Sequence, residues 1–437
     1  MVLTTIGLVP APARAESSEA PEPGWPAHVA SAIPEVLRPP AAVRQRCAFD
    51  TPVCVHTQGR VPRARVDEAL ATARHTLRAL QAAGLPSPLP DGFAGGGPEL
   101  DLYLDAAATA PTAQADTEVT TIGFDRAPTY VVIPPEVAGP PCAFGAAVAR
   151  ATAEAVLLGF DAAQHASTLA SFGSYVASRL RPCHAVELAA MDRFQRQPYR
   201  ALTEAERDQF TGSYVLPWWL DERWGTGLLG GVMAGLVATS SQTSPTADRW
   251  LTNEPDVWDA LRKVLGARES SLGDLLVDLA IARAFVGDRS DGMHLPDTEW
   301  MGALGRVRFE WAVDYDSLPR RLAPAAAVEP TGATYVYLDL AKADPHARLL
   351  VLAEWETAYV FEWAAVRLDA QGRELSRRLA GGVYGQDRVE LRIDDIDGAQ
   401  SLLLVGTALG HDDRKLDFDP DRGPPHRQSY TLTIHPE

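Results

Sequence analysis

The stretch from Cys142 to Asp161 constrains the fold of this chain most strongly. It reads Cys-Ala-Phe-Gly-Ala-Ala-Val-Ala-Arg-Ala-Thr-Ala-Glu-Ala-Val-Leu-Leu-Gly-Phe-Asp, and its alanine content gives it high helix propensity. Gly159 marks the expected end of the helix. Just upstream, residues 129–133 form a β-branched run closed by two prolines, which predicts a strand. We therefore expect a strand, a loop and an alanine-rich helix in succession.

This succession, with its ending from 155 to 161, resembles the core of secreted bacterial zinc metalloproteases of the zincin type that carry a C-terminal β-domain. In that group the helix reads His-Glu-x-x-His and continues into a Gly-Tyr-Asp-like tail. The resemblance places the first histidine at Arg150, the glutamate at Ala151 and the second histidine at Glu154. The third ligand, a glutamate on the following helix, would fall at Ser171. The resemblance therefore implies a degenerate member that lacks the zinc ligands.

The residues at these positions cannot carry out zinc hydrolysis. In a working site, two histidines four residues apart bind one zinc ion and the glutamate acts as general base. A guanidinium keeps its proton and cannot ligate zinc. Arg150 and Glu154 are four residues apart and can meet on one helix turn. Their pairing has two interpretations: a fixed positive charge where a dication would lie, or a solvated surface pair that contributes about 0.2–0.5 kcal/mol.

Composition and the N-terminal residues indicate the cellular location of the protein. A length of 437 residues accommodates two or three domains, and the net charge of −17 argues against nucleic acid or an anionic membrane as a partner. Residues 1–15 are expected to be a truncated signal peptide ending at Ala13-Arg14-Ala15. No uninterrupted apolar run approaches the roughly 18 residues that span a membrane. We expect a protein that is secreted, periplasmic or on the cell surface.

The four cysteines fit an exported protein with two disulfides. Three pairings are open from the sequence, and geometry favours one of them. Helices over 143–160 and about 163–181 are similar in length and joined by a short turn, so they should run antiparallel. That arrangement brings Cys142 and Cys183 to the same end of the hairpin. Cys47 then pairs with Cys54.

The remaining pattern predicts an α+β fold that ends in a C-terminal all-β sandwich, and the resemblance implies that a zincin-like metalloprotease domain precedes it. Residues 16–46 are a Pro- and Ala-rich leader, residues 47–322 the zincin-like domain and residues 325–437 the sandwich. Further expected elements are an amphipathic helix over 63–83, strands over 100–104 and 117–124, a helix near 217–225, and helices over 255–265 and 271–285. Short strands separated by turns are expected at 335–338, 347–353, 359–365, 389–393, 401–406 and 429–434.

Two other carboxylate-bearing segments are candidate metal sites. Asp161 and His165 are four residues apart and could rebuild a metal site with Glu154, although a polar pair at a helix start is the more ordinary interpretation. Asp417, Asp419 and Asp421 alternate as in a calcium loop. Their segment departs from the EF-hand pattern in its glycine and final ligand, which favours a solvated hairpin loop.

Three hypotheses about function follow. The first is an exported, catalytically inactive metalloprotease-like protein without a zinc cofactor, which binds an extracellular protein, a peptide or a glycan. The alternative is an active metal-dependent hydrolase with relocated ligands such as Asp161 and His165. The third is an extracellular structural module that attaches through its β-sandwich.

Overall fold

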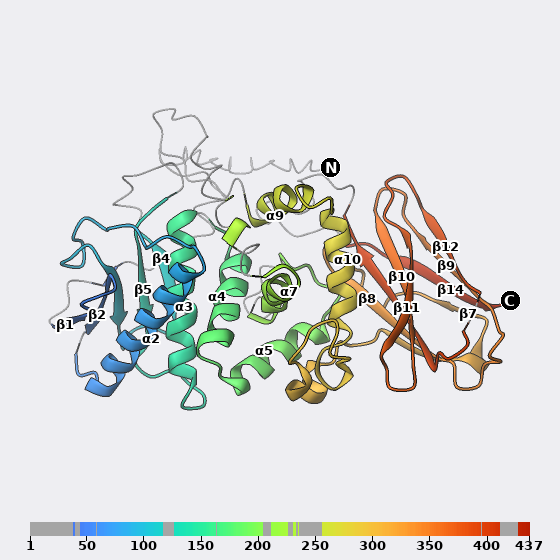
Figure 1. Cartoon of the computed structure of the whole chain (residues 1–437), viewed down its shortest axis with the longest axis horizontal. Coiled ribbons are helices and arrows are strands. Elements are labelled where there is room, and N and C mark those ends of the chain that lie inside the picture. The colour runs from blue at the N-terminus through green and yellow to red at the C-terminus, as the bar shows by residue number, and fades with distance from the viewer. Residues whose placement is uncertain are drawn as a thin grey trace, which may run out of the picture.

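The chain is an α+β protein built in three parts along its length (Figure 1). A sheet with two covering helices comes first, a helical middle follows, and two further sheets form the C-terminal part. The expected signal peptide, most of the leader and the strand expected at 117–124 lie outside the described residues. The computed structural model describes residues 38–39, 44–57, 59–116, 126–162, 164–203, 211–225, 230–232, 235, 256–394, 396–410 and 427–437.

The N-terminal sheet has five strands in the order β1-β2-β3-β5-β4. The central strands β2, β3 and β5 are parallel, whereas β1 and β4 are antiparallel strands at the two edges. The parallel connection from β2 to β3 passes through helix α2 (Arg63–Ala82), as a parallel crossover requires. The strands are β1 (Arg44–Cys47), β2 (Val53–Thr57), β3 (Leu100–Leu104), β4 (Thr112–Ala115) and β5 (Thr129–Ile133).

Two helices cover one face of this sheet. Val55, Leu102 and Val131 share one apolar core with the buried residues of α2 and of α3 (Ala143–Phe160). Successive strand residues point to opposite faces, so this core takes every second side chain. The bounds of α3 agree with the alanine-rich helix expected from the sequence.

The helical middle contains the helices that follow α3 in the chain. Several of its helices begin at side-chain caps; for example, Asp256 accepts from the backbone N–H of Asp259, and Ser271 accepts from that of Asp274. The elements are α4 (Ala166–Leu180), α5 (His184–Arg196), η2 (Thr211–Tyr214), α7 (Val215–Trp224), α9 (Val257–Gly266), α10 (Leu272–Arg283), η3 (Gly287–Arg289) and η4 (Glu299–Gly305).

The C-terminal part consists of two sheets that share one core, the two-layer arrangement of a β-sandwich. One sheet has the order β11-β10-β13-β8-β6 and the other the order β12-β9-β14-β7. Trp363 and Leu404 from the first sheet meet Val351 and Leu432 from the second in this core. The strands are β6 (Trp311–Asp314), β7 (Arg320–Leu322), β8 (Ala333–Asp339), β9 (Leu349–Trp355), β10 (Phe361–Leu368), β11 (Glu374–Gly381), β12 (Arg388–Ile393), β13 (Ser401–Ala408) and β14 (Tyr430–Pro436).

The first of these sheets is buried on both faces at its centre. Every residue of β13 is buried, because its outer face packs against the helical middle. Tyr335 of β8 donates from its hydroxyl to the carbonyl oxygen of Ala280 in α10, at 2.7 Å. The near-continuous apolar run Leu402–Val405 fits a strand covered on both sides. The helical middle and the two-sheet unit therefore share a packed boundary.

The two-sheet unit begins earlier in the chain than expected. Strands β6 and β7 fall within residues 47–322, the range assigned to the zincin-like domain. However, β6 pairs with β8 and β7 pairs with β14. Strand β11 was not expected at all, because its residues are mostly exposed and lack an alternating apolar pattern.

Both expected disulfides are present. Cys47 is bonded to Cys54 across the β1–β2 hairpin, and Cys142 is bonded to Cys183. The second bond joins the start of α3 to the residue before α5, so α3 and α4 form the expected antiparallel hairpin. Among the described residues, α3 alone is long and apolar enough to cross a membrane, with a mean hydropathy of 1.4. It is 83% buried within the protein, so its apolar surface is used for packing.

Candidate functional site

Helix α3 is the central element of the candidate site. All of its residues are buried except Ala147 and Arg150. Alanine side chains let neighbouring elements approach it closely on several sides, and α2, β4, β5 and α4 all contact it. The charged residues of α3 therefore lie among packed elements.

Arg150 and Glu154 form an ion pair within α3. Nε of Arg150 donates to Oε1 of Glu154 at 2.6 Å. The Glu154 side chain is 8% exposed and that of Arg150 is 30% exposed. The pair is thus partly buried, which separates it from the fully solvated surface pair considered above. A charge-assisted hydrogen bond of this length holds both side chains in one conformation.

A glycine of α4 lies directly over this pair. A Cβ atom at Gly173 would be 2.7 Å from Cγ of Glu154 and 2.9 Å from the carbonyl oxygen of Arg150. Only a residue without a side chain fits there, since carbon contacts below about 3 Å are repulsive. The backbone of α4 therefore packs on the turn that carries Arg150 and Glu154.

The other two positions singled out by the resemblance are not joined to this pair by any described hydrogen bond. Ala151 is 1% exposed and has no group that could accept a proton. Ser171 is buried and donates from Oγ to the carbonyl oxygen of Ser213 at 3.0 Å. The residues at the four positions do not fit a zinc ion: a guanidinium and a methyl group cannot coordinate it, and the one carboxylate is paired.

Asp161 and His165 make local contacts at the start of α4. The Asp161 carboxylate accepts from Nε2 of Gln164 at 3.1 Å. Nδ1 of His165 accepts from the backbone N–H of Ser167 and lies 2.7 Å from its hydroxyl. This is the N-cap role of a polar residue at a helix start. The carboxylates expected to form a calcium loop, Asp417, Asp419 and Asp421, lie outside the described residues.

One trio among the described residues has metal-ligand spacing: Cys54, His56 and Asp101. Cys54 is in a disulfide, so it has no thiolate to offer. Nε2 of His56 lies 2.7 Å from Asp101, and the other carboxylate oxygen accepts from Arg38 at 2.5 Å. Arg38 also pairs with Asp91 and Asp116, so this buried cluster already contains its cation.

A cavity of about 340 Å³ opens beside Arg150. Its walls come from one face each of α3, α4 and α5, from η2, and from the loops before β4 and α3. We call it the alanine-lined cavity. Its small apolar lining residues are Ala110, Pro111, Val137, Ala138, Ala143, Ala146, Ala147, Ala177, Val186 and Ala190.

The charged lining of the alanine-lined cavity is mainly basic. Among the described lining residues, three are arginines, Arg150, Arg181 and Arg193, and one is a carboxylate, Glu187. Glu187 accepts from the backbone N–H of Cys183 at 2.7 Å, at the start of α5. Burial raises the pKa of Glu187 and outweighs the lowering effect of that hydrogen bond and of His184.

Tyr214 also lines the same cavity, although less than 1 Å² of its hydroxyl oxygen is accessible. Its side chain is 1% exposed, and its hydroxyl oxygen has no hydrogen-bond partner among the described residues. Burial, together with the nearby charge of Glu187, raises the pKa of Tyr214. The phenol therefore stays protonated at physiological pH and can donate a hydrogen bond. A buried donor without a partner costs free energy, so the position calls for an acceptor.

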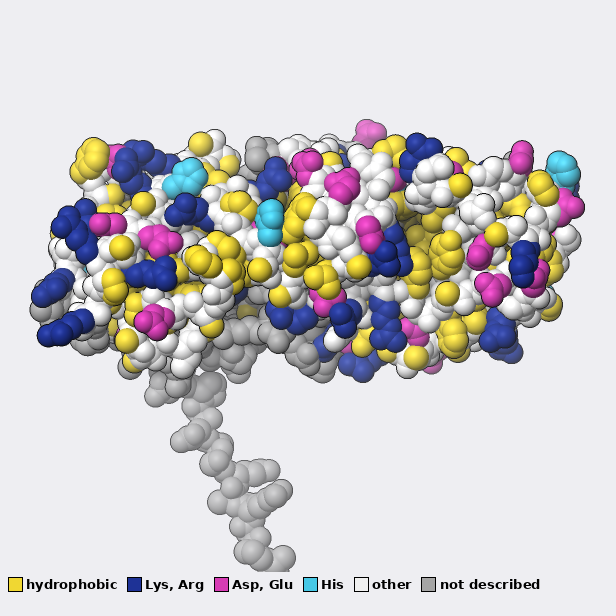
Figure 2. Space-filling model, turned by 90° about the horizontal axis from the view of Figure 1, so that it is seen from below, with side chains coloured by type: hydrophobic (Ala, Val, Ile, Leu, Met, Phe, Trp, Pro, Cys, Tyr) yellow, Lys and Arg dark blue, Asp and Glu magenta, His cyan; other side chains and the backbone are white. Residues whose placement is uncertain are grey.

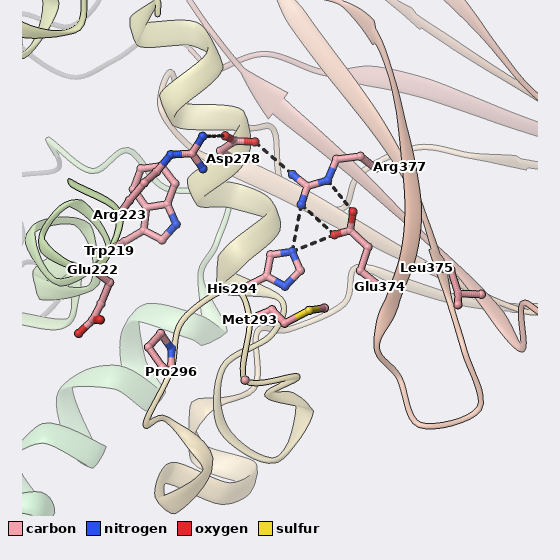
Figure 3. Close-up of a pocket in the computed structure, with 11 residues that line it drawn as sticks. Trp219, Glu222, Arg223, Asp278, Met293, His294, Pro296, Glu374, Leu375 and Arg377 are labelled. Atoms are coloured by element: carbon pink, nitrogen blue, oxygen red, sulfur yellow. Dashed lines mark hydrogen bonds and ion pairs between the residues drawn. The ribbon is translucent and has the colours of Figure 1, made fainter. Parts of the chain in front are cut away.

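A second, more open cavity of about 480 Å³ lies between the helical middle and β11 (Figure 3). A chain of ion pairs crosses it: Arg223 contacts Asp278, Asp278 contacts Arg377, and Arg377 contacts Glu374. Acidic and basic groups alternate, so their charges largely cancel. His294 completes the network.

His294 is held by three side chains. Nδ1 lies 2.8 Å from Asp291, Nε2 lies 2.8 Å from Glu374, and the ring stacks on Phe285 with centroids 4.0 Å apart. Burial lowers the pKa of His294, but the hydrogen bonds and charges of Asp291 and Glu374 outweigh it and raise that pKa. The same contacts lower the pKa of both carboxyls against the effect of burial.

Sequence reasoning missed both cavities. The basic side chains of the first come from α3, from the residue after α4 and from α5, and no local motif joins them. His294 and Glu374 are 80 residues apart, and neither lies in a recognisable pattern. On the face seen in Figure 2, basic and acidic side chains are interspersed among the described residues.

Comparison with known proteins gives no family assignment. No protein-family model matches the chain, and no curated protein matches it. One solved structure that matches is the pre-peptidase C-terminal domain of a collagenase from Bacillus anthracis, with 8% identity and a TM-score of 0.20 over 29% of this chain and 96% of that domain. A match at that score supports no inference about fold or function. The structure itself defines the class of protein: an α+β protein with two disulfides and a β-rich C-terminal part.

Proposed function

We propose that this protein is an exported, catalytically inactive relative of the zincin-type metalloproteases that binds a ligand in the alanine-lined cavity. The Arg150–Glu154 pair beneath Gly173 carries the proposal. It occupies the helix turn where the resemblance places both zinc-binding histidines, with a cation that keeps its proton. Ala151 at the position of the general base removes the second requirement for hydrolysis.

The surroundings of α3 support this kinship. A mixed sheet with an antiparallel edge strand, β4, precedes a long core helix, and a second helix follows it in an antiparallel hairpin. A β-rich part completes the chain, in the order that the resemblance implies. The two disulfides favour an oxidising compartment outside the cytoplasm, in agreement with export.

The alternative of a hydrolase with relocated ligands draws no support from the geometry. Asp161 and His165 are each engaged in contacts at the start of α4. They do not form a metal-spaced group with Glu154 among the described residues. The structural-module hypothesis draws no support either, since no described feature points to attachment through the sandwich.

The test is metal content combined with hydrolysis. Protein produced in an oxidising compartment is dialysed against zinc and analysed by inductively coupled plasma mass spectrometry. A quenched fluorescent peptide library then reports cleavage with and without added zinc. We expect no stoichiometric zinc and no cleavage. Retention of one tightly bound zinc per chain, or zinc-dependent cleavage that is lost in Asp161→Ala or His165→Ala, would refute the proposal.

A further inference from the structure

We infer that the alanine-lined cavity binds a carboxylate with an apolar group beside it, as found at the C-terminal end of a peptide. The inference rests on the proposed function, because it names the ligand class of the same site. Three independent features of the cavity carry it: its basic charge, one unpartnered donor and its small apolar lining.

The basic charge of the cavity is local. The chain as a whole has a net charge of −17, yet the described charged residues that line the cavity are three arginines and one glutamate. Arg150 is paired with Glu154, whereas Arg181 donates to the uncharged hydroxyl of Thr72 at 2.8 Å. At least one guanidinium thus keeps a charge that its described contact does not neutralise. Guanidinium groups recognise carboxylates through paired N–H donors, which makes an anionic ligand the expected complement.

Tyr214 supplies a donor that needs an acceptor. Its buried hydroxyl has no partner among the described residues and stays protonated because burial raises its pKa. A carboxylate oxygen that reached this hydroxyl, once the side chains that now cover it had moved aside, would accept its hydrogen bond and remove the cost of the unpaired donor. Glu187 does not fill this role in the described contacts, because its carboxylate accepts from the backbone N–H of Cys183.

The apolar lining selects an organic carboxylate over a small inorganic anion. Ala146, Ala177 and Ala190 from three helices leave space where larger side chains would fill it. A cavity of about 340 Å³ is at the small end of the range for ligand sites, and it suits one or two residues of a peptide. Pro111, directly before edge strand β4, also lines the cavity. An extended chain that enters there runs beside a strand, as peptides do when they add to a sheet edge.

The probes are N-acetyl-Ala-Phe and N-acetyl-Ala-Leu, each as the free acid and as the C-terminal amide, with inorganic phosphate as a plain anion. Isothermal titration calorimetry on the full chain measures affinity. We expect the acids to bind and the amides to bind at least tenfold more weakly, since a hydrogen bond to a charged group typically changes affinity by roughly tenfold or more. Phosphate should compete weakly, because it has no apolar group to bury.

Matched variants locate the site. Arg193→Met and Tyr214→Phe should each weaken binding of the acids roughly tenfold. Arg196→Met is the control, because Arg196 lies on the same helix, pairs with Asp192 and is not among the lining residues. Tyr214→Phe should leave the melting temperature of the free protein unchanged or higher, since the hydroxyl it removes has no described partner. A lower melting temperature would show that the hydroxyl is structural.

Three results would overturn the inference. Acids and amides could bind equally, which would leave a binding site without carboxylate selection. The second contradicting result is that neither acid binds. The third is that phosphate binds as tightly as the acids. None of these results bears on zinc content or cleavage, so failure of this inference is distinguishable from failure of the proposed function.

Discussion

Nε2 of His294 lies 2.8 Å from Oε2 of Glu374 and so joins the loop after α10 to edge strand β11 (Figure 3). The other ring nitrogen lies equally close to Asp291. Carboxylates accept hydrogen bonds, so the ring donates from both nitrogens only when it is protonated. The guanidinium of Arg377 is also 3.1 Å from Nε2, and its repulsion is offset by Glu374 and Asp278. The two carboxylates thus favour the protonated ring at this boundary and raise the pKa of His294.

The first prediction concerns pH. Because the pKa of His294 is raised above 6.5 in the folded protein, its protonation stabilises the fold fully below pH 6.5, and the contribution is lost as pH rises through the folded pKa. Wild-type protein should lose stability relative to His294→Gln as the pH rises above about 6.5. Chemical denaturation across this range measures the difference. Parallel stability curves for the two proteins would contradict the prediction, and Glu374→Gln should flatten the wild-type curve.

The second prediction concerns the contact of α4 on α3. Gly173→Ala should destabilise the protein by about 1–3 kcal/mol, because the added methyl group overpacks against Arg150 and Glu154. This exceeds the roughly 1 kcal/mol that alanine gains over glycine within a helix. Gly266→Ala is the matched control, since nothing lies within 4 Å of a Cβ atom there. Thermal unfolding of both variants decides the matter: equal effects would mean that the helices are not in close contact.

A third prediction addresses the ion pair itself. Arg150→Met leaves the buried Glu154 carboxylate without its partner and should cost about 1–3 kcal/mol. The double variant Arg150→Met/Glu154→Met should recover most of this, because apolar residues of similar volume often replace a buried ion pair without loss. The coupling energy, obtained from the stabilities of the wild type, the two single variants and the double variant, tests this prediction. Additive effects would instead indicate a solvated pair.

The fourth prediction compares the two disulfides. Cys142 and Cys183 are 41 residues apart and Cys47 and Cys54 are 7 apart. The chain-entropy model gives about 4 kcal/mol for the longer loop and about 2.5 kcal/mol for the shorter one. Replacing Cys142 and Cys183 by serine should therefore lower the free energy of unfolding more than the same change at Cys47 and Cys54. Equal losses under matched conditions would contradict this order.

Elements with a strong local pattern were predictable. The alanine-rich run gave helix α3 with its bounds, and the α3–α4 hairpin gave the pairing of Cys142 with Cys183. Strand β3 alternates over residues 100–104 and lies where expected. In each case the residues that decide the conformation are close together in the chain.

Elements that depend on distant partners were not predictable. Strand β11 is mostly exposed and exists because β10 pairs with it, and β6 is extended because it pairs with β8. The alanine-lined cavity requires three helices to meet, and the pair of Arg150 and Glu154 becomes partly buried only because Gly173 lets α4 approach. Sequence spacing placed Arg150 beside Glu154, but it held no information about what would cover them.

The close approach at Gly173 has an evolutionary consequence. Histidines introduced at 150 and 154 would meet a neighbouring backbone already in contact with that turn, and Ser171 is committed to Ser213. Several simultaneous changes, including a shift of one whole helix against another, would be needed before an ion could enter. Under the proposed kinship with zinc metalloproteases, each helix contact that tightens around this turn makes a zinc site harder to regain by single substitutions.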